Sequence, residues 1–518
     1  MHPSHHARAH PDKPAYIMAS SGISVDYRSL DERSNRLAHF WRSQGYAAGD
    51  TIAILLENHE WFLPLVWAAQ RSGLYYACLS HTLSGADLAY ILQDSGARCV
   101  IGSRRTLPLI EAARTEGASL AAFLVDHAGP EAPDIVEASL AFPATPVADE
   151  CAGTDMLYSS GTTGRPKGIR RPFVPGQPIA AETPMAPMAR TRFHIGEDSI
   201  YLSPAPLYHA GPLRWAMMVQ RLGGTVVIVE RFDAEQALAL IERHRVTASQ
   251  WVPTHFVRML QLPDDQRLAY DVSSMRAAFH AAAPCPIPVK EAMMDWWGPV
   301  IHEYYGGTEN NGLTLIGPEE WLERKGSVGK AVIGIIRICD DEGELLPAGA
   351  EGGVYFEGGP AFTYHNDEEK TRSSRNARGW TTLGDIGRLD DQGYLYLTDR
   401  KSFMIISGGV NIYPQEIENA LALHPKVRDV AVIGAPDPDM GERVVAVVEL
   451  RDLADASDAL KAELTAYLRE RLGGVKTPRQ IDFTDALPRE PTGKLFKRLL
   501  RDRYRIAGTS ADPARQPN

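Results

Sequence analysis

The stretch from Tyr158 to Gly168 combines hydroxyls, glycines and two cations in a way that suits a polyphosphate. Glycines let backbone N–H groups approach a phosphate closely, hydroxyls add donors, and Lys167 with Arg165 supplies charge-assisted bonds. The residues predicted to bind phosphate are Ser159, Ser160, Gly161, Thr162, Thr163, Gly164 and Lys167. The lysine does not have the spacing of a Walker loop, which disfavours a P-loop NTPase. A polar surface loop has a similar composition, so the segment does not decide the function by itself.

Two further segments carry groups that could hold a nucleotide. In Tyr304 to Glu309, aromatic rings offer a stacking face for a purine, Thr308 a hydroxyl for phosphate, and Glu309 a carboxylate for a hard cation. Mg²⁺ favours oxygen ligands and usually takes one or two carboxylates plus substrate phosphates. In the segment that ends at Asp385, a carboxylate follows a glycine and could accept both hydroxyls of a ribose. A lone Gly-Asp pair is more often just a turn.

Taken together and in order, these segments resemble the acyl-adenylate-forming superfamily, which comprises acyl-CoA synthetases, luciferases and the adenylation domains of peptide synthetases. The likeness covers nearly the whole chain and is strongest to bacterial acyl-CoA synthetases. It implies that Tyr305, beside Gly306, stacks on adenine, and that Thr308 and Glu309 serve the α-phosphate and Mg²⁺. Thr163 is the second residue that the resemblance assigns to the metal.

The resemblance also assigns the ribose and the adenine amino group. Asp385 matches the ribose aspartate, with Leu383 in place of a threonine, and Arg400 matches an arginine that reaches the ribose and phosphate. Glu303 falls where relatives often have Asn or Gln near the adenine amino group. This is a departure, although a carboxylate can still accept a hydrogen bond from an amine.

Four later residues are assigned by the resemblance to a moving C-terminal part and its hinge. Gly408 and Gly409 match the loop that lines the pantetheine tunnel, although paired glycines also suit a hairpin turn. Lys494 matches a catalytic lysine that enters the active site only for the first half-reaction. Ser402 stands at the hinge position, which is usually Asp or Lys in the family, and Lys401 beside it is a candidate for an ion pair.

The acyl group is expected among apolar stretches. His209 matches an aromatic gate beside the acyl channel, where we expect a steric rather than an acid–base contribution to catalysis. The pocket is predicted to lie within 207–215, 251–256 and 279–283, stretches without an evident carboxylate to hold an α-amine. This composition favours a fatty, aromatic or alicyclic acid over an amino acid. The predicted substrate contacts are His209, Trp215, Ala282, Ala283 and Gly307.

Composition narrows the class of protein. The chain has 518 residues, 44% hydrophobic and 23% charged, which is typical of a globular protein with at least two domains. A net charge of −11 disfavours nucleic acid as a partner. We expect no spanning helix and no secretory signal, with peripheral membrane contact only for a lipidic acid. Five scattered cysteines without metal-ligand spacing indicate reduced thiols in a cytoplasmic protein.

The site residues must be positioned by alternating strands and helices. Strands at 51–56 and 225–229 are each followed by a helical pattern, the second opened by Asp233, which predicts parallel sheets with ligands at their carboxyl edges. The predicted fold is α/β: a large N-terminal domain of doubly wound β-sheets with helices plus a small β-barrel-like subdomain, then a small mobile α+β C-terminal domain. The predicted boundaries are 1–399, a hinge at 400–402, a lid at 403–506 and a disordered tail at 507–518.

The sequence therefore predicts an ATP-dependent carboxylate–CoA ligase that uses ATP, Mg²⁺ and coenzyme A on a small-molecule carboxylic acid, and a homodimer is possible. Two alternatives stay open. One is a stand-alone adenylating enzyme that loads a carrier protein, and the other is a non-catalytic nucleotide-binding relative. A luciferase-like oxygenase would use the same scaffold.

Overall fold

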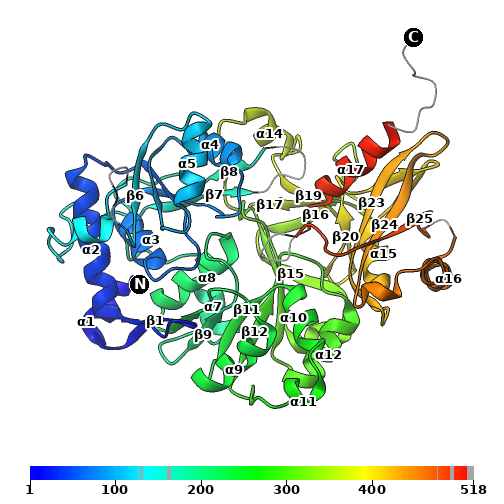
Figure 1. Cartoon of the computed structure of the whole chain (residues 1–518), viewed down its shortest axis with the longest axis horizontal. Helices are drawn as coiled ribbons and strands as arrows, with labels where there is room; N and C mark the ends of the chain where they lie inside the picture. Colours follow the sequence, from blue (N-terminus) through cyan, green and yellow to red (C-terminus); the bar gives the residue numbers. More distant parts are fainter. Residues whose placement is uncertain (128, 130–131, 160–164, 475, 490–494, 510–518) are drawn as a thin grey trace, which may run out of the picture.

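The computed structural model describes residues 1–127, 129, 132–159, 165–474, 476–489 and 495–509, with backbone only for 506–509. Three sheets organise this part of the chain (Figure 1). Two of them, of 13 and 7 strands, form the N-terminal part, and a third, of 5 strands, forms the C-terminal part. The predicted α/β class, with a large first domain and a smaller second one, is confirmed.

The centre of the largest sheet is parallel. Its strands run in the order β10 (Thr225–Ile228), β9 (Ile200–Ser203), β11 (Ala248–Trp251), β12 (Ala277–His280) and β13 (Ile301–Tyr305). The connecting helices include α8 (Ala210–Arg221), α9 (Ala234–His244) and α12 (Ile287–Trp297). Nearly all residues of β9, β10, β11 and β12 are buried, on both faces of the sheet, as expected for a covered parallel sheet. Asp233 caps α9 by accepting a bond from the Gln236 N–H at 2.9 Å, as the sequence predicted.

The region after residue 310 extends this sheet with antiparallel strands. They follow in the order β14 (Leu313–Ile316), β15 (Ser327–Ile333), β20 (Leu395–Arg400), β19 (Thr381–Leu389), β17 (Gly352–Glu357) and β16 (Ile335–Cys339). The prediction of antiparallel strands is confirmed. These strands are the predicted small subdomain, and β15 joins them edge to edge with the large sheet.

The second sheet carries the strands on either side of the predicted phosphate loop. Its order is β18 (Thr363–Tyr364), β8 (Lys167–Arg170), β7 (Thr154–Ser159), β4 (Tyr75–Cys78), β3 (Thr51–Ile54), β5 (Ala97–Gly102) and β6 (Ala121–Leu124). The strands from β7 to β6 are parallel, and β8 and β18 are antiparallel additions. Helix α3 (Phe62–Arg71) follows β3, and α2 (Tyr27–Ser43) packs against α3.

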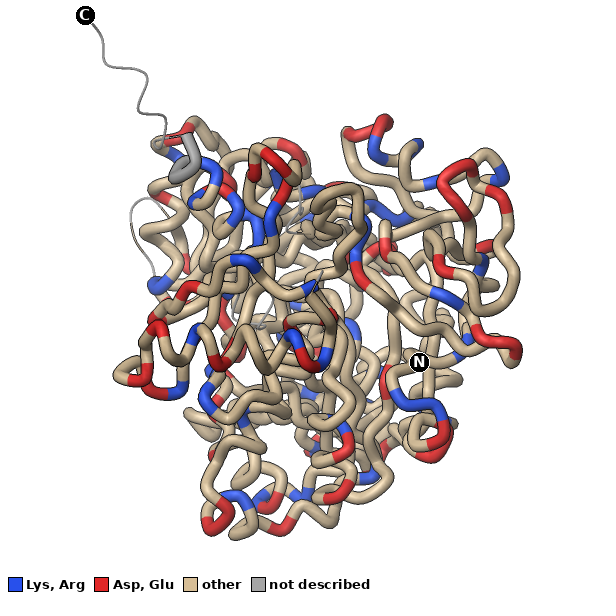
Figure 2. The backbone as a smooth tube through the Cα atoms, turned by 90° about the vertical axis from the view of Figure 1, so that its right-hand side faces the viewer, with Lys and Arg blue, Asp and Glu red and all other residues tan. Residues whose placement is uncertain are grey.

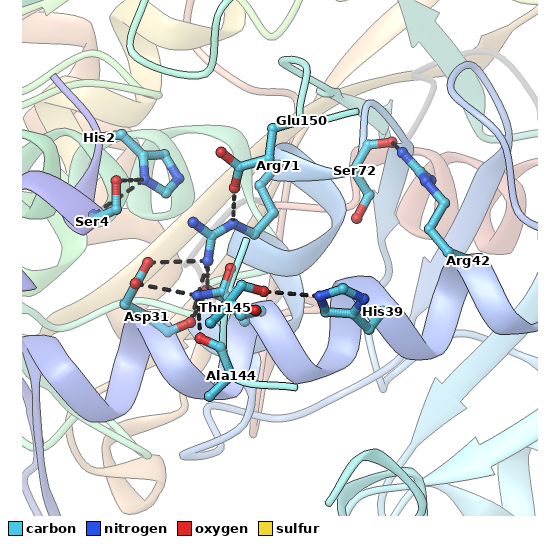
Figure 3. A network of polar contacts seen from close by, with 12 residues as sticks. His2, Ser4, Asp31, His39, Arg42, Arg71, Ser72, Ala144, Thr145 and Glu150 are labelled. Atoms are coloured by element: carbon cyan, nitrogen blue, oxygen red, sulfur yellow. Dashed lines mark hydrogen bonds and ion pairs between the residues drawn. The ribbon is translucent and has the colours of Figure 1, made fainter. Parts of the chain in front are cut away.

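A buried arginine ends α3 and fixes its neighbours (Figure 3). The Arg71 side chain is fully buried, and it lies 3.0 Å from Asp31 Oδ1 of α2 and 2.8 Å from Glu150 Oε1. Its Nη1 also donates to Ser34 Oγ at 2.9 Å. The two partly exposed carboxylates therefore neutralise a guanidinium that has no access to water, and this joins α2, α3 and the segment before β7.

The third sheet has its own core. It contains β21 (Ile405–Ser407), β22 (Val410–Ile412), β23 (Val427–Asp437), β24 (Gly441–Leu450) and β25 (Gln480–Thr484), covered by α15 (Pro414–Leu421) and α16 (Asp458–Leu472). The chain passes from the large sheet to this one between Arg400 and Ile405, so the predicted hinge at 400–402 falls at the change of sheet. Helix α17 (Lys497–Thr509) runs three residues into the predicted disordered tail, whose remainder lies outside the described residues.

Acidic and basic residues are interspersed along the side of the chain that faces the viewer in Figure 2. Among the described residues, no helix has the length and apolar content needed to cross a membrane.

Candidate active site

The strands that flank the phosphate loop hold its described cations. Ser159 ends β7 and Lys167 begins β8, and these two residues are register partners. Lys167 Nζ lies 3.8 Å from Asp367 Oδ2, and the Arg165 guanidinium lies 5.1 Å from the ring centroid of Tyr90. The predicted phosphate ligands from Ser160 to Gly164, including the metal candidate Thr163, lie outside the described residues, and their roles stay predictions.

Strand β18 connects this hairpin to Glu309, the carboxylate predicted to bind the metal. Tyr364 pairs with Ile169 of β8, and its hydroxyl donates to Glu309 Oε1 at 2.8 Å. Burial, and after it the charge of Glu309, raises the pKa of the Tyr364 hydroxyl, so the tyrosine keeps its proton and acts as the donor. Glu309 is thereby fixed next to the strand that begins with Lys167. Tyr364 could not be predicted from its own segment, because only the strand register brings it next to Glu309.

The turn after β13 brings Glu309 and Thr308 to the carboxyl edge of the large sheet. A Cβ on Gly307 would lie 2.6 Å from Glu309 Oε2, so a larger residue there would displace the carboxylate. The Thr308 carbonyl accepts a bond at 3.1 Å from Nη2 of Arg214, which also holds Asp155 Oδ2 of β7 at 2.6 Å. Arg214 therefore ties the two sheets together at the site, a role that its surroundings in the sequence did not reveal.

Of the residues assigned to adenosine, Asp385 is hydrogen-bonded to both Tyr305 and Arg400. Asp385 of β19 lies opposite Arg400 of β20 in the strand register, and Arg400 Nε donates to Asp385 Oδ1 at 3.0 Å. Tyr305 donates its hydroxyl proton to Asp385 Oδ2 at 2.6 Å. Burial and the Asp385 charge hold the pKa of Tyr305 well above its usual value, and Asp385 raises that of Arg400. Since a carboxylate has about four acceptor positions, Asp385 can still accept ribose hydroxyls.

Glu303 has an ion partner that the sequence did not predict. Its carboxylate is buried on β13, and Oε2 receives a bond from Lys290 Nζ of α12 at 2.7 Å. Burial raises the pKa of Glu303 and Lys290 lowers it. His280 Nε2 lies 3.5 Å away, but burial and then Lys290 hold its pKa well below the usual value, so Lys290 supplies the charge. The Glu303 side chain therefore serves a buried ion pair, and its contact with adenine stays a prediction.

The predicted acyl pocket is divided between two faces of the sheet. Trp215 has 1% of its surface exposed and lies with its ring 4.5 Å from that of Phe279, while its Nε1 donates to Tyr304 Oη at 3.2 Å. Trp215 therefore packs in the core, and its predicted contact with the acid stays a prediction. Trp251 and Phe256 belong to a separate core cluster, so they do not line one pocket with Phe279.

The other acyl candidates lie at exposed or partly exposed positions. His209 is the N-cap residue of α8, and its ring lies 4.5 Å from that of Tyr208. Ala282 and Ala283 are exposed directly after β12. Ala282 has a φ of 74°, a left-handed conformation that is strained for a residue with a Cβ. Their predicted substrate contacts, with that of Gly307, stay predictions.

The C-terminal candidates lie on or beside the third sheet. Gly408 and Gly409 form the two-residue turn between β21 and β22 with φ values of 58° and 80°, which only glycine adopts without strain. Arg501 of α17 donates to the carbonyls of Ser402 and Phe403 at 3.0 and 3.3 Å, and Lys401 forms an ion pair with Asp341. The tunnel and hinge roles stay predictions.

Lys494 itself lies outside the described residues, but its flanks are placed. Arg489 binds Asp429 of β23 and pairs with Leu495 in an isolated bridge. The Phe496 N–H donates to the carbonyl of Pro488 at 2.8 Å. The segment that contains Lys494 therefore starts and ends at one anchored point on the third sheet.

Known proteins share this architecture. The family model of the AMP-binding enzyme matches residues 4–363, and that of the AMP-binding enzyme C-terminal domain matches residues 416–494. The chain is 32% identical over 507 residues to the long-chain-fatty-acid–CoA ligase FadD13 of Mycobacterium tuberculosis, covering 96% of this chain and 97% of that protein. It is likewise 32% identical over 511 residues to a feruloyl-CoA synthase of an Amycolatopsis species, covering 96% and 97%.

A solved structure agrees with these matches. The o-succinylbenzoate CoA synthetase MenE of Bacillus subtilis, in complex with its acyl-adenylate intermediate, has a TM-score of 0.78 and 28% identity, covering 96% of this chain and 97% of that chain. The match extends over both sheets of the N-terminal part and the third sheet. The chain therefore belongs to the AMP-binding enzymes, the acyl-adenylate-forming superfamily that its motifs resemble.

Proposed function

We propose that this protein is an ATP-dependent carboxylate–CoA ligase. The observation that carries the proposal is the cluster of Tyr305, Asp385 and Arg400 at the sheet edge, with Glu309 linked to the strand of Lys167. First, a carboxylate oxygen of the acid attacks the α-phosphorus of ATP and the bond to the β-phosphate breaks, giving acyl-AMP and pyrophosphate. Then the CoA sulfur attacks the acyl carbon, the bond to AMP breaks, and the thiol proton passes to solvent.

The described residues contribute mainly by positioning and charge. Tyr305 offers its ring to adenine, while Asp385 accepts the ribose hydroxyls and Arg400 holds Asp385 in place. Lys167 supplies positive charge to the phosphates, and the same contribution is proposed for Lys494, which lies outside the described residues. Correct orientation alone is worth roughly 7–11 kcal/mol in well-aligned reactions, and removing one electrostatic donor costs about 2.7–4 kcal/mol.

The carboxylate of Glu309 fits a magnesium site. Its Oε1 is oriented by Tyr364, and Mg²⁺ often binds to one protein carboxylate and several phosphate oxygens. A bound Mg²⁺ would neutralise phosphate charge. Among the described residues no cluster of three or more acidic, histidine or cysteine side chains could hold a metal alone, which agrees with a site completed by the substrate.

The second half-reaction requires a different arrangement of the C-terminal part. We infer that rotation about Ser402 withdraws Lys494 and brings the Gly408–Gly409 turn to the thiol path. The acid is proposed to be hydrophobic, either fatty, aromatic or alicyclic, because the relatives named above include a long-chain-fatty-acid–CoA ligase and a feruloyl-CoA synthase. His209, Ala282 and Ala283 are the proposed contacts of the acid.

A pyrophosphate assay tests the proposal. We expect the purified protein with Mg²⁺ and ATP to release pyrophosphate when given short, medium, long-chain, aryl or alicyclic acids, and to form a thioester with free CoA. Carrier protein in place of CoA is the control acceptor. Release of pyrophosphate with transfer only to the carrier would replace the CoA ligase by a carrier-loading enzyme, and no release with any acid would exclude adenylation.

The hydroxyl of Tyr305 offers a smaller, specific test. Tyr305→Phe keeps the ring but removes a bond to a charged group, worth about 1.5–3 kcal/mol, so we expect KM for ATP to rise roughly tenfold or more with kcat nearly unchanged. Steady-state kinetics with varied ATP measure this. Tyr270→Phe, which loses a bond to Glu235 at 3.0 Å, is the matched control and should leave KM unchanged. An unaltered KM in Tyr305→Phe would show that the Tyr305 hydroxyl does not contribute to ATP binding through Asp385.

A further inference from the structure

A small cavity lined by arginines lies beside the phosphate-loop hairpin but outside the proposed active site. It measures about 180 Å³ and is lined by Arg170, Arg171 and Arg375, with Tyr75 and Phe362 as aromatic walls. Arg170 is three residues from Lys167 along the chain. Because successive side chains of a strand alternate, the two cations lie on opposite faces of β8, about 10 Å apart along the strand.

The three guanidiniums are poorly balanced by negative charge. The Arg170 guanidinium lies 4.6 Å from the ring centroid of Tyr75, and Arg375 Nη2 donates to the Phe362 carbonyl at 2.9 Å. Among the described residues, the carboxylate bonded to any of the three is that of Asp155, which binds Arg171. Burial, and after it the charge of Arg214, lowers the pKa of Arg171 to about 9.

We propose that this cavity is a binding site for a phosphate group. Arginine forks match the geometry of phosphate oxygens, and charge-assisted bonds to phosphate are roughly twice as strong as neutral ones. The volume is below the 300–1,000 Å³ typical of sites for drug-sized ligands, so it suits a small anion or one phosphate of a larger molecule. The whole chain carries a net charge of −11, so a local cluster of cations favours anion binding at this cavity.

The cavity is connected to the active site through one carboxylate. Asp155 Oδ1 faces Arg171 at the cavity, and Asp155 Oδ2 faces Arg214 at 2.6 Å. Arg214 in turn holds the carbonyl of Thr308 at 3.1 Å. A phosphate that draws Arg171 toward itself leaves Asp155 to Arg214 alone. Binding in the cavity therefore has a direct route to the Thr308–Glu309 turn, and the binding itself does not depend on the proposed ligase activity.

Calorimetric titration with inorganic phosphate tests the site. We expect Arg375→Ala and Arg170→Ala to weaken phosphate binding at least tenfold, Arg375→Lys to restore part of it, and Arg372→Ala, an exposed arginine of α14 (Glu368–Ser373) that does not line the cavity, to change nothing. Lys167→Ala separates the two phosphate sites, because it should leave this binding intact. Arg375 is exposed, so its variants should melt like the wild type.

Phosphate binding that is lost in Lys167→Ala but kept in the Arg170 and Arg375 variants, or no binding at all, overturns the proposal. If binding depends on the cavity arginines, competition identifies the source of the phosphate. Displacement by coenzyme A but not by 3′-dephospho-CoA assigns the site to a terminal phosphate of that molecule, and displacement by neither assigns it to free phosphate.

Discussion

Replacing Lys494 by alanine is expected to slow acyl-AMP formation by about 100- to 1,000-fold while leaving thioester formation from supplied acyl-AMP nearly unchanged. The first step places new negative charge on oxygens around the α-phosphorus, and an ammonium group would stabilise it there. The second step expels AMP and makes no such demand on Lys494. Rapid-quench measurement of pyrophosphate release, beside single-turnover transfer from synthetic acyl-AMP to CoA, separates the two rates.

Another lysine of the C-terminal part supplies the control. Lys461 of α16 is a partly exposed lysine on the same domain, 3.2 Å from Asp458. Lys461→Ala should leave both half-reactions at the wild-type rate. Equal losses in both half-reactions of Lys494→Ala would contradict the exchange of domain positions, and no loss in either would remove Lys494 from catalysis.

The second large effect concerns stability rather than chemistry. Arg71→Ala is expected to reduce the free energy of unfolding of the N-terminal part by about 3–5 kcal/mol, because it breaks a buried ion pair and leaves charges without a partner. Arg71 is fully buried, whereas Asp31 and Glu150 are 19% and 21% exposed. The variant loses a cation that two carboxylates on separate segments share. Urea unfolding followed by tryptophan fluorescence measures the difference.

An exposed pair gives the comparison. Arg28 lies 2.9 Å from Asp12, with side chains 55% and 83% exposed, and Arg28→Ala should cost about 0–1 kcal/mol. The triple variant Arg71→Met, Asp31→Asn, Glu150→Gln, which removes all three charges together, should recover part of the loss in Arg71→Ala. If Arg71→Ala costs no more than Arg28→Ala, the network does not stabilise the fold.

Short-range features of this protein could be predicted from its sequence. Asp233 caps α9 as its spacing indicated, and Asp385 and Arg400, separated by a single turn and two strands, become register partners. In both cases the contact lies within one local unit. The family resemblance extended this to the order of the motifs, because a motif series fixes which loops share the edge of a sheet.

Long-range features could not be predicted. The partner of Glu303 is Lys290 on the preceding helix, which depends on how α12 lies on the sheet. Trp215 packs against Phe279 and donates to Tyr304, contacts that depend on how α8 lies on the sheet. Arg214 contacts Asp155 and Thr308, which lie 59 and 94 residues away in sequence. Such contacts depend on how whole helices and strands pack, so they cannot be inferred from one segment of the sequence.

The register of β19 with β20 places Asp385 opposite Arg400. Arg400 is the last residue of β20, and the chain leaves the large sheet immediately after it. A nucleotide bound to Asp385 would therefore restrain the end of β20, after which the C-terminal part begins. In the proposed rotation, the bound nucleotide would hold the N-terminal side of the hinge in place while the C-terminal part turns. Nucleotide binding and domain rotation would therefore depend on the same strand end.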